Sequence, residues 1–109
     1  MNASRFGLPL MAVEKIHSIL ALHPLVAKAV LYGSRAKGNY KTGSDIDLTL
    51  FGEGLGYRDL LEISGQLDDL LLPYTIDLSL FATLSHPDLR EHIQRAGIVF
   101  YERAAADVQ

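Results

Sequence analysis

The 109-residue chain contains no cysteine, which excludes a disulfide framework and a thiolate metal site. It has no apolar run near the roughly 20 residues that a bilayer requires, so no membrane segment is expected. Positive charge is not in excess either, because the formal net charge is −3, and no direct binding of nucleic acid is indicated. Residues 1–13 make a poor secretory signal, since Pro9 interrupts a short apolar stretch, and a cytoplasmic location is expected.

The composition that remains is that of an ordinary globular domain. Hydrophobic residues make up 49% of the chain and charged residues 21%. A chain of this length has room for one domain of usual size. We therefore expect residues 1–109 to form a single domain with its core at about residues 12–101.

Hydrophobic periodicity and helix breakers predict an alternation of helices and strands. Helices are predicted over residues 12–22, 58–72 and 88–96, and a short helical turn over residues 34–37. Strands are predicted over residues 26–32, 45–51, 75–81 and 98–101. This order favours an α/β (α+β) fold, in which a small mixed sheet has helices packed on one face.

Two hexamers share one polar pattern: Asp-Ile-Asp-Leu-Thr-Leu at residues 45–50 and Thr-Ile-Asp-Leu-Ser-Leu at residues 75–80. Alternate side chains of a strand share a face, so neighbouring strands would bring Asp45, Asp47 and Asp77 together on one open face. At ~5 Å and an effective dielectric of ~20, each carboxylate pair repels by roughly 3 kcal/mol. A cation would offset this repulsion, and hard oxygen ligands suit Mg²⁺. A solvated polar face is the alternative, although such a face usually includes basic residues as well.

Gly33 and Ser34 directly follow the first predicted strand and open the predicted turn. Glycine lets a phosphate approach the backbone closely, and free N–H groups at the start of a helical turn attract anions. Arg35 and Lys37 could neutralise phosphate charge. An ordinary strand-to-helix turn explains a Gly-Ser pair equally well. The pair becomes a more specific signal because ten residues separate it from Asp45. This spacing would place a phosphate site beside the acidic face.

The segments 33–38 and 44–48 closely resemble the signature of the polymerase-beta-type nucleotidyltransferase superfamily, and more narrowly that of its minimal members, the MNT domains. Residues 74–78 match the segment that carries the third carboxylate in that family. The resemblance implies a polymerase-beta-like nucleotidyltransferase fold in which three catalytic carboxylates hold two Mg²⁺ ions. The carboxylates would be Asp45, Asp47 and Asp77. The site for the phosphates of ATP would comprise Gly33, Ser34, Arg35, Lys37 and Ser44.

Minimal domains of this kind resemble the antitoxins of HEPN/MNT toxin–antitoxin pairs. The resemblance implies transfer of AMP from ATP to a tyrosine hydroxyl of a HEPN-domain toxin, which an adjacent gene encodes and which forms a hetero-oligomer with its antitoxin. The short chain leaves no room for an acceptor domain, which independently favours a protein partner. Two alternatives stay open. The chain could neutralise its partner by complex formation without catalysis, or it could transfer a nucleotide to a small molecule.

Overall fold

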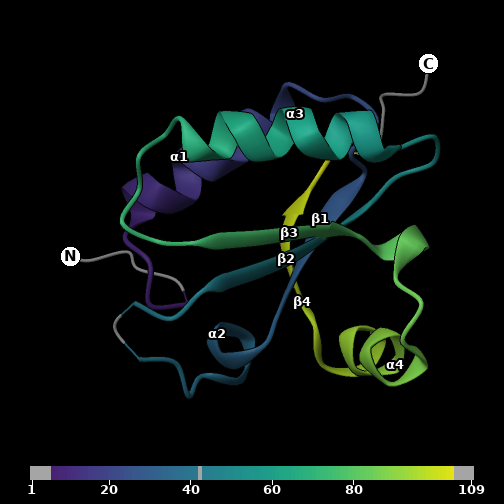
Figure 1. Ribbon diagram of the computed structural model, residues 1–109. Helices are drawn as coiled ribbons and strands as arrows, with labels where there is room; N and C mark the ends of the chain where they lie inside the picture. The colour runs from purple at the N-terminus through teal and green to yellow at the C-terminus, as the bar shows by residue number, and fades with distance from the viewer. Residues whose placement is uncertain (1–5, 42, 105–109) are drawn as a thin grey trace.

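A four-stranded sheet forms the middle of the computed structural model, which describes residues 6–41 and 43–104 (Figure 1). Its strands are β1 (Lys28–Tyr32), β2 (Ile46–Phe51), β3 (Ile76–Leu80) and β4 (Ile98–Glu102), in the spatial order β3-β2-β1-β4. Strand β2 runs parallel to β3, whereas β1 pairs antiparallel with both β2 and β4. The predicted mixed sheet is confirmed, and the strand ends differ from the prediction by no more than two residues.

Helices α1 (Leu10–Ala21) and α3 (Tyr57–Asp68) lie together on one face of the sheet (Figure 1). Their apolar sides pack against the apolar positions of β1 and β2, as the alternating pattern of the hexamers predicts. The side chains of this core that have no exposed surface are Leu8, Ile16, Leu20, Val26, Ala29, Leu31, Ile46, Leu48 and Ile63. This packing leaves the polar positions of β2 and β3 on the opposite face.

Both long helices differ from the prediction by two or more residues at one end and by one residue at the other. Helix α1 starts two residues earlier than predicted, at Leu10, because Pro9 is its N-cap and the fixed φ of proline suits a helix start. Helix α3 ends at Asp68, four residues before the predicted end. Leu71 has a φ of +55°, a left-handed conformation that an α-helix of L-residues cannot continue.

Helix α4 (Pro87–Ala96) packs on the opposite face, so the expectation that all helices cover one face is correct only for α1 and α3. Its buried Ile93 forms a second, smaller core with Val30 and Phe81. Gly97 makes this arrangement possible, because a Cβ there would lie 2.5 Å from Val30 Cγ1. Periodicity shows which side of a helix is apolar, but it does not show which face of the sheet that side will cover.

Two short elements complete the part of the chain that the structure describes. Helix α2 (Ser34–Lys37) follows β1 through Gly33, and the 3₁₀ turn η1 (Phe81–Thr83) follows β3. Helix α2 lies on the same side of the sheet as α4 (Figure 1). Across residues 6–41 and 43–104, no helix is long and apolar enough to cross a membrane.

Candidate active site

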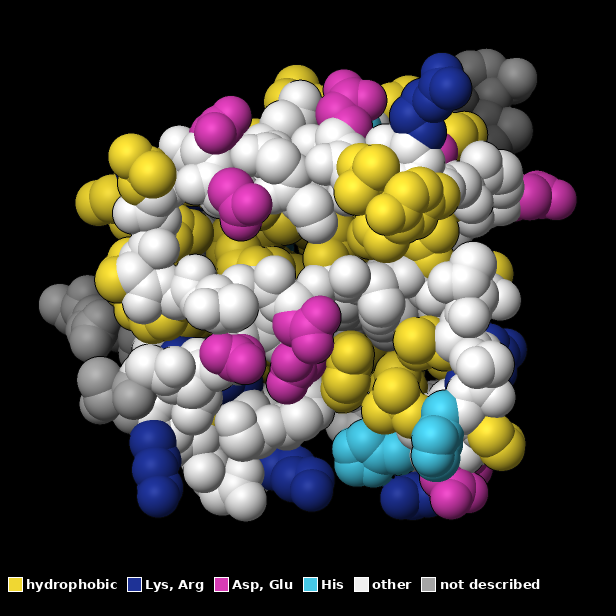
Figure 2. Space-filling model, viewed as in Figure 1, with side chains coloured by type: hydrophobic (Ala, Val, Ile, Leu, Met, Phe, Trp, Pro, Cys, Tyr) yellow, Lys and Arg dark blue, Asp and Glu magenta, His cyan; other side chains and the backbone are white. Residues whose placement is uncertain are grey.

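Asp47 and Asp77 are direct neighbours on the adjacent parallel strands β2 and β3, where their Cα atoms are paired in register. Residues paired in this way send their side chains to the same face. Asp45 immediately precedes β2 and is exposed, as is Asp77, whereas Asp47 is partly buried. Acidic side chains gather on the same side of the sheet as α2 in the space-filling view (Figure 2). The structure thus brings Asp47 and Asp77 together and places Asp45 at the near end of β2.

The carboxylates act on one another electrostatically. The pKa of Asp47 is raised above its ordinary value of 3.8, first by burial, then by the negative charge of Asp77, and then by that of Asp45. The only ion pair among the described residues joins Arg95 to Glu91 on α4, so none neutralises these three carboxylates. This face therefore carries uncompensated negative charge.

This face suits a cation because of its negative charge. Burial and the charges of Asp77 and Asp45 raise the pKa of Asp47, and a divalent cation would stabilise such a set of oxygen donors. In the described part of the chain, however, no group of three His, Cys, Asp or Glu side chains is already arranged around one metal position. Asp45 lies outside the strand, directly before its first residue Ile46.

Gly33 connects β1 to α2 and lies directly against Asp47. Its φ of +80° and ψ of −155° belong to a region that only glycine adopts readily. A Cβ on Gly33 would lie 2.4 Å from Asp47 Oδ2, so a larger residue would displace the carboxylate. Ser34 is the first residue of α2, where the leading N–H groups have no acceptor within the helix. The predicted phosphate turn and acidic face therefore adjoin.

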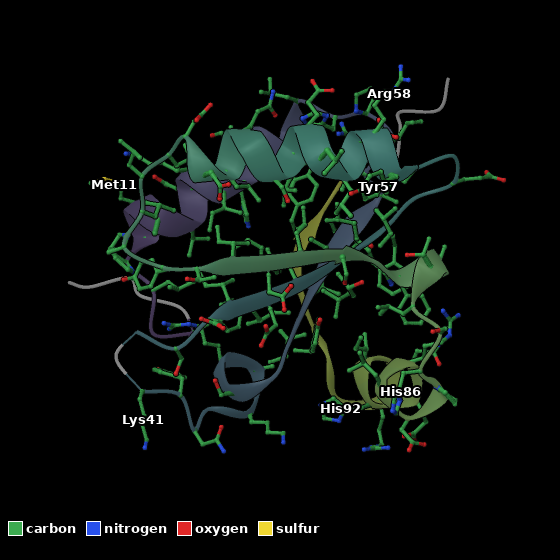
Figure 3. All side chains as sticks on the ribbon, in the orientation of Figure 1. Met11, Lys41, Tyr57, Arg58, His86 and His92 are labelled. Atoms are coloured by element: carbon green, nitrogen blue, oxygen red, sulfur yellow. The ribbon has the colours of Figure 1, made fainter. Side chains whose placement is uncertain are left out.

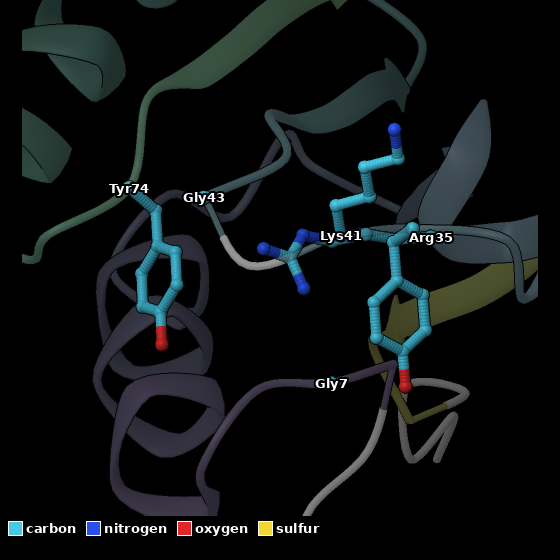
Figure 4. A pocket seen from close by; sticks show the side chains of 6 residues that line it. Gly7, Arg35, Lys41, Gly43 and Tyr74 are labelled. Carbon is cyan, nitrogen blue, oxygen red and sulfur yellow. The ribbon is translucent and has the colours of Figure 1, made fainter.

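Arg35, which the sequence analysis places among the phosphate-binding residues, contacts other parts of the protein in the structure. The Arg35 side chain is only 3% exposed, and its guanidinium donates to the carbonyl oxygen of Ser44 from Nε (3.1 Å) and from Nη2 (2.8 Å). Nη1 donates to the carbonyl oxygen of Phe6 at 2.8 Å. The guanidinium also lies 5.3 Å from the ring centre of Tyr40 and 5.2 Å from that of Tyr74, beside a cavity of about 120 Å³ (Figure 4). We therefore assign Arg35 a structural role, which is to hold the loop before Asp45.

The two other predicted phosphate residues differ in their surroundings. The Ser44 hydroxyl accepts a hydrogen bond from the backbone N–H of Lys41 at 2.8 Å, so it helps to close the loop that ends at Asp45. Lys37 is exposed at the end of α2, and Lys41 extends outward from the loop (Figure 3). Both lysines are exposed.

Tyr32 is a residue of this face that the sequence analysis missed. It is the Cα partner of Asp47 across the antiparallel pair of β1 and β2, so the two side chains share a face. Burial raises the pKa of the Tyr32 hydroxyl, a hydrogen bond with Ser79 lowers it, and the charges of Asp47 and Asp77 raise it. The end of an apolar strand just before Gly33 is the only sequence signal for this residue, and its pairing with Asp47 depends on the fold.

Comparisons with known proteins agree with this geometry. The family model described as "Polymerase beta, Nucleotidyltransferase" matches residues 14–106. A protein of Methanocaldococcus jannaschii that is proposed to be a protein adenylyltransferase is 35% identical over 81 residues, which are 73% of this chain and 84% of that protein.

Solved structures share the fold. A toxin–antitoxin crystal structure with AMP-PNP aligns with a TM-score of 0.68 at 22% identity, over 84% of this chain and 74% of the other. A complex of tri-AMPylated HEPN toxin from Shewanella oneidensis with MNT antitoxin aligns with a TM-score of 0.63 at 20% identity, over 85% of this chain and 71% of the other. At these identities the likeness establishes the fold.

Proposed function

Because the chain belongs to the polymerase beta nucleotidyltransferase family, we propose that it is a Mg²⁺-dependent protein adenylyltransferase that moves AMP from ATP to a tyrosine hydroxyl of a partner protein. The observation that carries the proposal is the pairing of Asp47 with Asp77 beside the Gly33 turn. Acidic residues that would repel one another in the absence of a cation lie next to the start of α2, whose leading N–H groups would donate to a phosphate.

Asp45, Asp47 and Asp77 would hold Mg²⁺, with two ions expected. When bound, the metal would neutralise phosphate charge and favour ionisation of the attacking hydroxyl. The electrostatic coupling of the three carboxylates supports this role, because burial and the charges of Asp77 and Asp45 raise the pKa of Asp47, and a divalent cation would relieve the repulsion.

The chain's own residues then have distinct tasks. Gly33 and Ser34 would hold the β- and γ-phosphates, and Lys37 would add positive charge from the surface. The acceptor oxygen would form a bond to the α-phosphorus as the bond from that phosphorus to the β-phosphate bridging oxygen breaks, so pyrophosphate leaves. Asp77 would take the proton of the acceptor hydroxyl. Positioning and charge stabilisation supply most of the catalysis in such a displacement.

The acceptor in this proposal is a HEPN-type toxin encoded next to this chain, and the two proteins would form a hetero-oligomer in the cytoplasm. Two observations support a protein acceptor. The Methanocaldococcus jannaschii relative is proposed to be a protein adenylyltransferase, and one structure with the same fold is an MNT antitoxin bound to a tri-AMPylated HEPN toxin. In this chain the transfer would silence the toxin, which makes the chain an antitoxin.

Intact-mass measurement of the partner tests the proposal. The purified chain is mixed with Mg-ATP and the product of the adjacent gene, and the partner should gain mass in steps of one adenylyl group. Asp47→Asn should abolish the gain, whereas Asp69→Asn, a matched change at the exposed C-cap of α3, should leave it intact. A partner that gains no mass, or gains it equally with Asp47→Asn, contradicts the proposal.

The same variants separate catalysis from simple occlusion of the toxin. Cells that express the toxin with wild-type antitoxin should grow, and cells that express it with the Asp45→Asn/Asp47→Asn double variant should not. Full protection by the double variant would show that complex formation alone neutralises the toxin.

A further inference from the structure

A cavity of about 120 Å³ lies beside the buried Arg35 side chain (Figure 4). Its walls come from three separate segments, which are the residues just before α1, α2 with the loop that follows it, and the residues just before β3. The lining residues are Gly7, Arg35, Tyr40, Lys41, Gly43 and Tyr74. Two of these six are cationic and none is acidic, so the cavity has a positive lining.

Arg35 brings a charge to this cavity that no carboxylate balances. The side chain is 3% exposed, and the one ion pair among the described residues, between Glu91 and Arg95, lies on α4. Buried charges in proteins are normally paired, because an unpaired ion loses the stabilisation that water would give. The ring centres of Tyr40 and Tyr74 lie 5.3 and 5.2 Å from the guanidinium and offset part of this loss. The net charge beside the cavity remains positive.

The guanidinium also has hydrogen-bond donors that its carbonyl contacts do not use. Of its five N–H groups, those on Nε and Nη2 donate to the carbonyl oxygen of Ser44, and one on Nη1 donates to that of Phe6. Within residues 6–41 and 43–104, one N–H on each terminal nitrogen is therefore left for another acceptor. Two such groups at the end of one planar fork suit two oxygens of a single anion.

The size and charge of the cavity favour a small dianion. Drug-sized ligands occupy pockets of roughly 300–1,000 Å³, so a cavity of about 120 Å³ admits a single ion or one terminal group of a larger molecule. Lys41 extends outward from the loop, and its flexible stem allows the ammonium to turn toward a bound anion (Figure 3). Arg35 and Lys41 together carry two positive charges, and a phosphate group carries about −1.5 to −2 charges at pH 7.

We propose that the cavity beside Arg35 binds a phosphate group, either as inorganic phosphate or as the terminal phosphate of a monoester. Nη1 and Nη2 of Arg35 donate to two of its oxygens, and Lys41 contacts a third from the surface. Because Arg35 also holds the carbonyl of Ser44, an occupied cavity would steady the loop that leads to Asp45. This binding does not depend on the proposed adenylyl transfer, because no carboxylate of the acidic face lines the cavity.

Two-dimensional ¹H–¹⁵N NMR spectra test the proposal when the metal-free protein is titrated with sodium phosphate at neutral pH and constant ionic strength. The Arg35 Nε–H signal and the backbone N–H signals of Lys41 and Gly43 should shift along one saturable curve. In the same spectra, the N–H signals of Gly33 and Ser34 report separately on the turn after β1. Shifts confined to Gly33 and Ser34, or shifts at Arg35 that do not saturate, overturn the proposal.

Substitutions of the exposed Lys41 test the role of charge without changing the buried side chain. Lys41→Ala removes one charge-assisted contact and should weaken phosphate binding by about tenfold. Lys41→Glu places a carboxylate at the cavity and should abolish phosphate binding. Lys15→Ala is the matched control, because it makes the same change at an exposed lysine of α1 and should leave phosphate affinity unchanged. Wild-type affinity in both Lys41 variants overturns the proposal.

Arg35→Lys keeps the positive charge but removes the planar fork, so it should lose phosphate binding. The change also removes contacts with two carbonyl groups, and thermal melting shows whether the variant folds. If it folds and binds phosphate with wild-type affinity, the proposal is overturned. If it does not fold, the two Lys41 variants decide the outcome.

Glycerol phosphate, titrated in parallel, separates the two sources of the phosphate group. Binding tighter than that of inorganic phosphate supports a monoester ligand, and equal or weaker binding supports the free ion. Failure of both probes to bind overturns the proposal, and it does so whether or not the chain transfers AMP.

Discussion

At the scale of single residues, Gly33 and Asp47 depend on each other. Gly33 supplies a backbone conformation that other residues rarely adopt, and the absence of a Cβ leaves room for the Asp47 carboxylate. Asp47 is in turn the carboxylate whose pKa burial and its acidic neighbours raise. The unusual backbone conformation of Gly33 and the raised pKa of Asp47 are therefore both features of the site that these two residues form together.

Gly33→Ala should abolish adenylyl transfer, because its Cβ would displace Asp47 Oδ2, and it should also lower the free energy of unfolding by about 1–3 kcal/mol through backbone strain. Gly38→Ala is the matched control, since Gly38 has a φ of +89° but a Cβ there would meet no atom beyond its chain neighbours within 4 Å. It should lower stability in a similar way and keep transfer activity. Chemical denaturation and the intact-mass assay measure the two effects, and equal activity in both variants would contradict the close approach at Gly33.

Asp47→Asn should raise the Tm of the metal-free protein at neutral pH by about 2–4 °C, after allowance for solvent screening at this partly exposed group. Folding raises the pKa of Asp47, so the folded chain binds more protons than the unfolded chain between the ordinary value of 3.8 and the raised value. Metal-free stability therefore falls as pH rises through that window. Melting curves recorded from acid to neutral pH should show the advantage of Asp47→Asn appearing as pH rises, and a constant difference would contradict this cause.

At the scale of elements, α2 and the loop that follows it are organised by Arg35. The buried guanidinium joins α2 to the carbonyl of Ser44, directly before Asp45, and to the carbonyl of Phe6 near the start of α1. The rings of Tyr40 and Tyr74 flank it. One basic side chain thus fixes the loop that leads into β2, and this explains why its charge is buried instead of facing the acidic side chains.

Arg35→Ala should lower the free energy of unfolding by about 2–3 kcal/mol, because it removes charge-assisted hydrogen bonds from a buried guanidinium to the partly buried carbonyl groups of Phe6 and Ser44. Lys37→Ala should leave stability nearly unchanged, since Lys37 is exposed, but it should raise the KM for ATP several-fold. Urea denaturation and steady-state kinetics measure these effects. The structural role of Arg35 would be contradicted if Arg35→Ala changed only the KM for ATP.

At the scale of the whole molecule, the sheet separates the larger hydrophobic core from the acidic face. One face packs against α1 and α3 and holds the larger core, and the other is divided between the small core under α4 and the acidic face near α2 (Figures 1 and 2). Tyr32 lies at the border of these two parts. The larger core thus lies on one side, and in the described part of the chain no ion pair involves Asp45, Asp47 or Asp77 on the other.

Mg-ATP should stabilise the folded protein by about 2.7 kcal/mol at one hundred times its dissociation constant. ATP with a chelator should stabilise it much less, because the carboxylates would then face the triphosphate without a cation between them. Thermal shift assays measure the difference, and the Asp45→Asn/Asp47→Asn double variant is the control that should lose the effect of Mg²⁺. Equal stabilisation by ATP with and without Mg²⁺ would contradict the metal site.

Much of this arrangement follows from short-range sequence features. The period of two in the hexamers determines which side chains of β2 and β3 share a face, and α1 and α4 end within one residue of the ends that proline and glycine predict. The position of Gly33 between an apolar strand and a polar turn predicts a close approach to the glycine backbone, and in the structure the group that approaches it is the Asp47 carboxylate. These features are local, so they can be recognised without knowledge of the fold.

Other features depend on which segments meet in three dimensions. The parallel register that pairs Asp47 with Asp77 joins residues thirty positions apart, and periodicity alone leaves the partner strand and its direction open. Arg35 follows the Gly-Ser pair and so resembles a phosphate ligand in the sequence, but two carbonyl groups from other segments bury its charge. Tyr32 gains its place only because β1 pairs with β2 in antiparallel register. The sequence by itself therefore determined the chemical types at the site, and the tertiary structure decided which of them lie close enough to act together, because strand pairing and burial are set by contacts between distant segments.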